Sequence, residues 1–263
     1  MENSKVKNVI IVILLAVNLA LGGLLIRNTT GAQSLKHAAF EDLKAVLKNN
    51  GIELRIDALP SAENVFAYTA KRNETAEAEI AKQFINECIV DDQGGNIYYY
   101  HSGDGSVRFR SGGDFEAEFE SPVDGAKVKN VLSQYSINIE ITQNGEVEAS
   151  QVLNGYEIVN CKVEAEFEEG NVISLRGRWL LSETETDYTM QAMDATTAMM
   201  RFVGIIEKHG IICTEISELS LGYSMSAQVS GLFELIPVWR VVTDTGEYQV
   251  NAVTGTVERI QSD

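Results

Sequence analysis

The sequence predicts an α+β protein carried on a single N-terminal transmembrane helix. An uncharged apolar segment runs from Val9 to Ile26. Downstream, segments with apolar residues at helical spacing are followed several times by segments in which apolar and polar residues alternate. Turns rich in Gly and Asn separate the alternating segments. These observations predict helices packed on antiparallel sheets, with duplicated helix-then-hairpin units after Pro122 and after Asp187.

The segment of residues 9–26 is just long enough to cross a bilayer. As a helix its 18 residues would span about 27 Å, close to the ~30 Å hydrocarbon thickness. Lys5 and Lys7 precede it and only Arg27 follows closely, so the positive-inside rule places residues 1–8 in the cytoplasm and the body outside the membrane. A cleaved signal peptide is the alternative, because small residues at 30–32 offer a cleavage site.

Two features of this predicted anchor favour contact with another helix. Ala16, Ala20 and Gly23 fall on one helical face and would allow a close approach. Asn18 lies on a different face, and hydrocarbon cannot satisfy its side-chain amide. The alternative is that these residues have no partner, since small residues are common in spanning helices.

Composition narrows the classes of partner and chemistry. The chain has 263 residues and a net charge of −17, which argues against nucleic acid and against an anionic lipid surface as partners. Cys88, Cys161 and Cys213 are widely spaced and include no C-x-x-C pair. We therefore expect buried thiols rather than a disulfide framework or a metal site, although one pair could still bridge in an oxidising exterior.

A linker at residues 27–33 is predicted to lead into a first extracytoplasmic domain, residues 34–121. Apolar residues recur at helical spacing from Leu35 to Leu47, and Asn50-Gly51 ends that helix. A second helix is capped by Asn73 or Thr75. The predicted strands of this domain cover residues 52–56, 65–70, 96–101, 106–110 and 114–120.

A second domain is predicted for residues 122–263. Ser121-Pro122 is expected to end the preceding strand and to open a third helix that reaches Tyr135. The segment from Met190 to Lys208 is expected to form a long helix, stopped by His209-Gly210. Asn144-Gly145 predicts a two-residue hairpin. The predicted strands cover residues 137–141, 146–152, 159–168, 172–181, 211–225, 237–243, 248–252 and 256–260.

No catalytic motif of known spacing occurs in the sequence. His101 and Asp104 could form the acid–base pair of a hydrolase, but a polar turn accounts for both residues. Glutamates at 116, 118 and 120, and again at 164, 166 and 168, alternate with apolar residues and are expected to face solvent. The acidic turn at residues 91–96 does not fit a calcium loop. We therefore expect no catalytic residue, metal or cofactor.

The C-terminal part carries a more specific pattern, a hairpin that ends on a Gly turn. Its residues are Gly222, Tyr223, Pro237, Trp239, Tyr248, Asn251 and Gly255. Together with Lys5-x-Lys7, the apolar segment and Asn18-Leu19, this pattern resembles the YycI family of membrane-anchored regulators, which accompany the WalK/WalR two-component system of Gram-positive bacteria. The related YycH family and PepSY-type domains share this kind of ending.

The resemblance implies regulation without catalysis. It implies an extracytoplasmic α+β body and one transmembrane helix that associates with the membrane helices of the sensor histidine kinase and with a YycH-like sister protein. The alternative is an exported PepSY-like binding or protease-inhibitory module, for which the membrane helix is only a tether.

Overall fold

The computed structural model describes residues 37–134, 137–141, 147–228 and 231–260. The predicted tail, anchor and linker therefore lie outside the described residues. Within the described ranges no helix is both long enough and apolar enough to cross a membrane.

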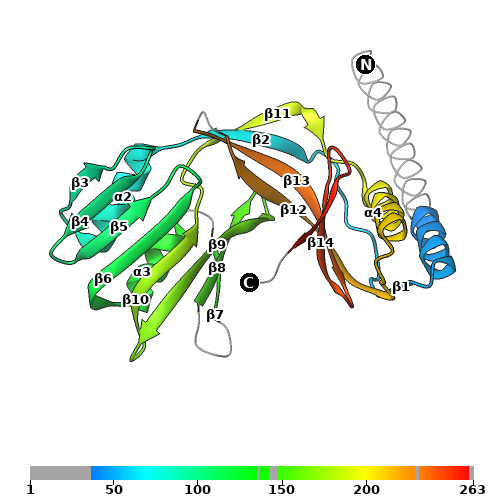
Figure 1. Cartoon of the computed structure of the whole chain (residues 1–263), viewed down its shortest axis with the longest axis horizontal. Helices are drawn as coiled ribbons and strands as arrows, with labels where there is room; N and C mark the ends of the chain where they lie inside the picture. Colours follow the sequence, from blue (N-terminus) through cyan, green and yellow to red (C-terminus); the bar gives the residue numbers. More distant parts are fainter. Residues whose placement is uncertain (1–36, 135–136, 142–146, 229–230, 261–263) are drawn as a thin grey trace, which may run out of the picture.

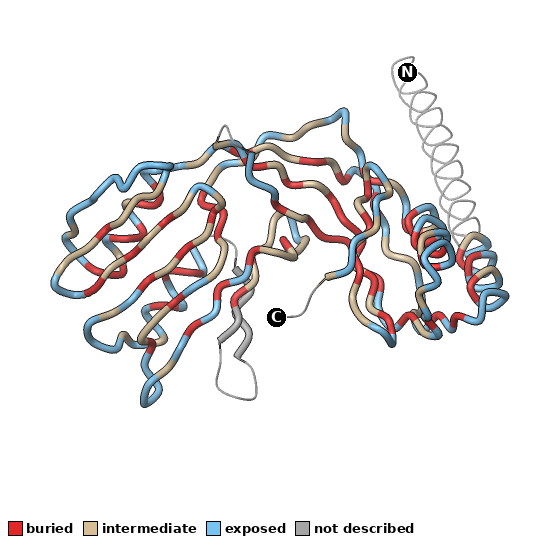
Figure 2. Tube along the Cα trace, in the orientation of Figure 1, coloured by how far each residue is buried: buried red, intermediate tan, exposed pale blue. Residues whose placement is uncertain are grey.

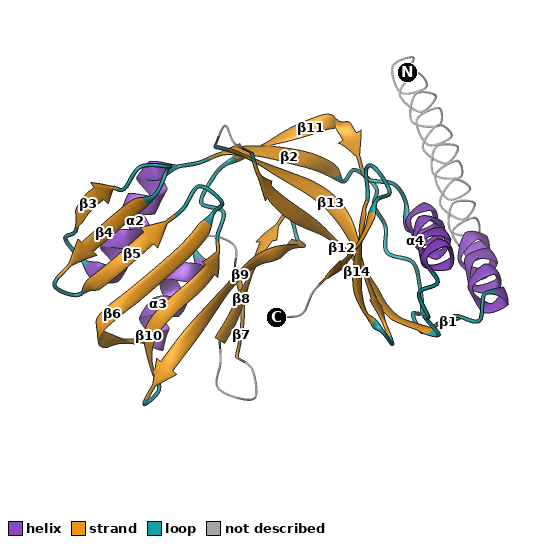
Figure 3. Cartoon of the chain, viewed as in Figure 1, coloured by secondary structure: helices purple, strands orange, loops and turns teal. Residues whose placement is uncertain are grey.

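The described strands belong to one continuous, mainly antiparallel sheet of 15 strands (Figure 1). Its main path runs in the order β11-β2-β13-β12-β9-β10-β6-β5-β4-β3, with β1, β7, β8, β14 and β15 attached beside it. The helices are residues 37–49, α2 (Glu74–Ile85), α3 (Gly125–Ser133) and α4 (Ala195–His209). Figure 3 shows α2 and α3 against one half of the sheet, and α4 with the helix of residues 37–49 against the other half. The mixed α+β class is thus confirmed.

Strands that are consecutive in the sequence mostly pair with one another in antiparallel orientation. Their bounds are β1 (Glu53–Leu54), β2 (Phe66–Lys71), β3 (Ile89–Asp92), β4 (Tyr98–Ser102), β5 (Gly105–Phe109), β6 (Asp114–Asp124), β7 (Ile137–Ile141), β8 (Val147–Leu153), β9 (Tyr156–Glu168), β10 (Asn171–Arg178), β11 (Thr184–Gln191), β12 (Glu215–Ala227), β13 (Leu232–Thr243), β14 (Gly246–Asn251) and β15 (Val257–Ile260).

A helix followed by a four-strand antiparallel meander occurs three times: α2 with β3 to β6, α3 with β7 to β10, and α4 with β12 to β15. This order extends the predicted helix-then-hairpin pattern to a third unit. Likeness of the units to PepSY-type repeats stays a prediction.

Several local signals act as predicted. Asn73 caps α2, and its side chain accepts a hydrogen bond from the backbone N–H of Ala76 at 3.1 Å. Gly51 ends the helix of residues 37–49 at a φ of +76°, a conformation that glycine adopts without strain. β7 and β8 pair as the predicted hairpin, whose turn lies outside the described residues.

Two predicted boundaries are wrong. Ser121-Pro122 does not end its strand, because β6 continues to Asp124. The register between β6 and β10 shifts just before that end, and an irregularity of this kind tolerates a proline that cannot donate to the ladder. The last helix begins at Ala195 rather than Met190, since the side chain of Asp194 caps it through the backbone N–H of Thr197 at 2.9 Å. The preceding residues form β11, which the sequence analysis missed, as it missed β3.

Buried hydrophobic residues form two clusters, one in each half of the sheet. Figure 2 shows the buried positions along the chain in both halves. The Trp239 cluster lies under the helix of residues 37–49 and α4, and the Trp179 cluster lies under α2 and α3. Residues 40–70 and 192–252 contribute to the same Trp239 cluster, so this cluster joins segments from both sides of the predicted boundary at residue 122. The division into two separate domains stays a prediction.

β9 is the strand that the two clusters share. Ile158 and Cys161 at its start belong to the Trp239 cluster, whereas Val163 and Ala165 belong to the Trp179 cluster. The start of β9 pairs in parallel with β12 at Tyr223, and its end pairs with β10. The two halves of the molecule are therefore joined through β9.

Candidate functional site

The four residues proposed to contact a partner helix, Ala16, Asn18, Ala20 and Gly23, lie outside the described residues. They stay a prediction. The seven residues of the C-terminal pattern are all described, and they divide into a core group, a turn and a strand junction.

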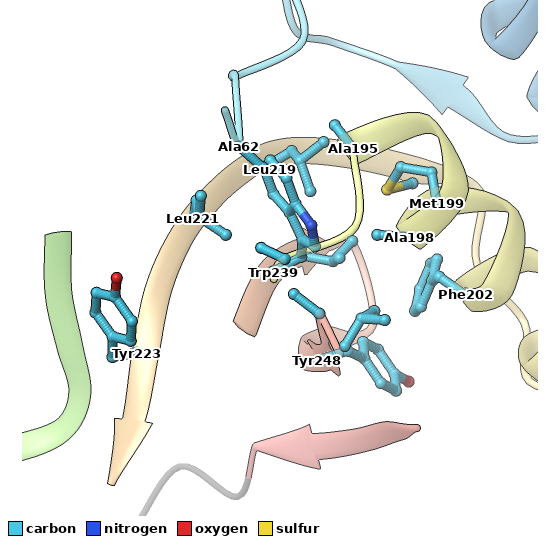
Figure 4. Packing of buried hydrophobic residues seen from close by; sticks show 14 of the residues in the cluster. Ala62, Ala195, Ala198, Met199, Phe202, Leu219, Leu221, Tyr223, Trp239 and Tyr248 are labelled. Carbon is cyan, nitrogen blue, oxygen red and sulfur yellow. The ribbon is translucent and has the colours of Figure 1, made fainter. Parts of the chain in front are cut away.

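Trp239 is the centre of the core group (Figure 4). Its side chain is fully buried, and its indole Nε1 donates a hydrogen bond to the backbone carbonyl of Met193 at 3.0 Å. Tyr248 packs edge-on against Phe202 of α4, with ring centroids 5.3 Å apart. A buried indole needs a hydrogen-bond partner, so this contact ties β13 to the segment that opens α4.

Asn251 and Gly255 form the turn between β14 and β15. The Asn251 side-chain carbonyl accepts hydrogen bonds from the backbone N–H groups of Val253 and Thr254, both at 2.9 Å. Gly255 has a φ of +78° and donates its N–H to the backbone carbonyl of Asn251 at 2.8 Å. Both residue types are therefore set by the geometry of the turn.

Gly222, Tyr223 and Pro237 lie where β12 meets β9. A Cβ atom at Gly222 would lie 2.7 Å from the carbonyl oxygen of Glu157 on β9, so only glycine allows this approach. Tyr223 pairs with Pro237 across the β12–β13 ladder. Its ring meets that of Tyr68 at a centroid distance of 5.5 Å, and burial raises the pKa of its hydroxyl above the usual range.

Two side-chain amides complete this junction by replacing backbone pairing. The Asn160 amide donates to the carbonyl of Met225 at 2.7 Å and accepts from its N–H at 2.8 Å. The buried Gln151 amide makes the same pair of bonds with Leu180, at 2.7 and 2.9 Å. Neither residue could be identified from the sequence, because no local pattern marks an amide that bonds to a distant segment of the chain.

His101 and Asp104, for which the sequence favours a polar turn over an acid–base pair, have different partners. His101 Nε2 lies 3.2 Å from an Asp91 carboxylate oxygen on the neighbouring strand, and the imidazole stacks on the ring of Tyr99. Asp104 instead accepts a hydrogen bond from the side chain of Asn86 at 2.5 Å. The antiparallel register of β3 and β4 sets His101 opposite Ile89, two residues from Asp91, and so decides its partner.

The predicted glutamate ladder on β6 is partly paired. Glu116 accepts hydrogen bonds from the guanidinium groups of Arg110 at 2.9 Å and Arg108 at 3.1 Å. The hydrogen bond from Arg110 lowers the pKa of the Glu116 carboxyl despite partial burial. The two guanidinium groups therefore compensate the charge of Glu116 on the face of the sheet.

A buried ion pair at the start of α2 is a further feature that the sequence analysis missed. Arg72 and Glu77 form a bidentate contact, with Nε–Oε1 and Nη2–Oε2 distances of 2.6 and 2.8 Å. Their side chains are only 7% and 8% exposed. Arg72 also donates to the backbone carbonyls of Asn96 and Phe109, so the pair joins α2 to the strands beside it.

The three cysteines are free thiols, and burial raises the pKa of Cys161 to about 12. Across the part of the chain that the structure describes, no group of three or more His, Cys, Asp or Glu side chains is placed to hold a metal ion.

The fold and these contacts define an α+β protein. The seven residues of its C-terminal pattern belong to a core, a turn and a strand junction. The chain belongs to the YycI family: the family model described as "YycI protein" matches residues 32–253. This family is a regulatory one, and its members act in the WalK/WalR two-component system.

Comparison with curated proteins finds no match. Among solved structures, the chain is similar to an uncharacterized protein from Eubacterium rectale ATCC 33656, with 15% identity and a TM-score of 0.45. The alignment covers 80% of this chain and 90% of that chain.

Proposed function

We propose that this protein is a membrane-anchored, extracytoplasmic regulator of a WalK-like sensor histidine kinase. It acts without catalysis, through the helix of residues 9–26, together with a YycH-like partner. The family match over residues 32–253 is the observation that carries the proposal. The match begins at residue 32, after the apolar segment of residues 9–26 and within the predicted linker.

The chemistry of the anchor supports a specific contact rather than a tether. Helices in lipid associate through small residues that let backbones approach and through polar groups that hydrocarbon leaves unsatisfied. Ala16, Ala20 and Gly23 supply the first, and Asn18 supplies the second. Coupling through a membrane requires such a helix, because lipid-exposed leucine gives no preferred partner.

The proposal is tested by replacing residues 9–26 with a poly-leucine helix of equal length. Kinase output is followed with a reporter, and association by co-purification with the kinase and the YycH-like protein. We expect both to be lost while the protein stays in the membrane. Single changes then separate the contact residues from the apolar character of the helix as a whole. Asn18→Leu and Gly23→Leu should reduce kinase output and co-purification, whereas the control Leu15→Ala should not.

Two results would refute the proposal. Unchanged kinase output and unchanged co-purification with the poly-leucine helix would remove the role of the membrane contact. Full function of an exported chain that starts at Gln33 would favour the alternative, a PepSY-like binding or protease-inhibitory module that the helix only tethers.

A further inference from the structure

A cavity of about 660 Å³ lies beside the first turn of the helix of residues 37–49. The loop of residues 57–63 and the start of α4 form its other walls. This volume falls within the range of small-molecule sites, about 300 to 1,000 Å³. None of the residues assigned above to the family pattern lines it.

The inner wall of the cavity is apolar and belongs to the Trp239 cluster. Phe40, Ala62, Ala192 and Ala195 are buried there, and Leu59 packs against the same cluster. The wall is therefore held by the folded core and does not depend on one mobile side chain. Such a surface favours an apolar ligand body, at about 25 cal/mol for each Å² removed from water.

The carboxylates of Asp57 and Asp194 line the cavity, and the first turn of the helix adds the His37 imidazole; no described lining residue is a Lys or Arg. Burial raises the pKa of Asp194, but the hydrogen bonds from Thr197 outweigh this effect and leave the pKa below its usual value. Asp194 is thus an anion at neutral pH. Asp57 is exposed at the rim, where it can meet a charged group on a ligand.

We propose that this cavity binds a small organic cation with an apolar body, of the alkylammonium or arylalkylammonium class. The apolar part occupies the wall formed by Phe40 and Leu59, and the ammonium group lies at the rim beside Asp57. An anion of the same shape is repelled by the carboxylates of Asp57 and Asp194, and a neutral analogue gains only the apolar contact.

The position of the cavity gives this site a route to the membrane. His37 and Phe40, on the first turn of the helix, form part of its wall, and the chain that precedes His37 carries the predicted anchor. An occupied cavity holds this turn against α4 and the loop of residues 57–63. This regulatory consequence rests on the proposed function, whereas binding of the cation does not.

The test uses three ligands that share a phenylalkyl body and differ in the head group and its charge: phenylbutylammonium, phenylbutanol and phenylbutyrate. Each is titrated by calorimetry into the full chain in nanodiscs of neutral lipid, with empty nanodiscs as the blank for partitioning. We expect saturable binding of the cation, about two- to fivefold tighter than that of the alcohol, as an exposed ion pair provides. We expect no saturable binding of the carboxylate.

Two variants locate the site. Asp57→Asn should weaken the cation about two- to fivefold, and Asp42→Asn is its matched control, because Asp42 is an exposed carboxylate on the adjoining helix outside the cavity. Ala58→Trp fills the cavity from its exposed rim and should abolish binding, while circular dichroism checks that the fold is kept.

Equal affinity for the cation and the alcohol would overturn the charge preference. Binding that survives Ala58→Trp, equal weakening by both aspartate variants, or no binding of the cation would overturn the site. None of these results bears on kinase association, so failure here is distinguishable from failure of the proposed function.

Discussion

At Gly222, β12 approaches β9, the strand that joins the two halves of the sheet, and Gly222→Ala tests whether this close approach is required. A Cβ atom there would lie 2.7 Å from the carbonyl oxygen of Glu157 and 3.1 Å from a methyl carbon of Val159. The nearer atom belongs to the backbone of β9, so it cannot rotate away as a side chain would. The added methyl must push β9 and β12 apart.

The cost follows from overpacking at a buried position. Inserting a methyl into a well-packed site destabilises proteins by about 1 to 3 kcal/mol. Gly222 does not have a positive φ, so backbone strain adds nothing and the whole effect is steric. The Asn160 amide, which bonds to Met225 a few residues along β12, should be displaced with the strand.

Gly204→Ala is the matched control, the same chemical change with the opposite expected sign. Gly204 lies inside α4, and a Cβ atom there has no neighbour within 4 Å. Alanine replaces glycine in a helix with a gain of about 0.5 to 1 kcal/mol. Urea unfolding of the full chain in neutral detergent, followed by tryptophan fluorescence, measures both variants. Trp179 and Trp239, the two tryptophans of the sequence, report one cluster each.

The reasoning is refuted if Gly222→Ala leaves the free energy of unfolding unchanged or raises it. It is refuted equally if Gly204→Ala destabilises the chain as much as Gly222→Ala does, because the loss would then come from glycine itself rather than from the junction.

Three further changes test the contacts of the described residues. Glu77→Gln leaves the Arg72 charge buried without its partner and should cost about 3 to 5 kcal/mol in urea unfolding, whereas a loss below about 1 kcal/mol would mean that the pair is solvated. Asn251→Ala removes the acceptor of two backbone N–H groups and should cost about 1 kcal/mol, seen as a lower urea midpoint. The pKa of Glu116 is lowered in the fold by Arg110, so its contribution is present above the unfolded-state pKa and is lost as the pH falls through the folded-state pKa. Glu116→Gln should therefore reduce the difference between urea midpoints measured at neutral and at strongly acidic pH, and an unchanged difference would contradict this.

The local elements of the fold could be predicted because their signals are local. The cap at Asn73, the stop at Gly51 and the alternating strand from Cys161 to Ala165 each depend on neighbouring residues. Where a nearby signal was misjudged, the boundary was wrong: Asp194 rather than Met190 opens α4, and Pro122 is accommodated in an irregular stretch of β6. β3 was missed because all four of its residues are exposed, so that it carries no alternation of buried and exposed positions.

For the candidate site, too, some features depend on the sequence alone and others only on the tertiary structure. The sequence by itself determined the uncharged segment of residues 9–26, the acidic character and the C-terminal pattern of the YycI family, because these depend on residue type and order. Only the tertiary structure decided that Glu157 approaches Gly222, that Asp91 rather than Asp104 faces His101, and that Arg72 and Glu77 are buried together. It also brought Phe40, Leu59 and Asp194 around one cavity. These arrangements depend on register and on packing between distant segments, for which a single sequence holds no local signal.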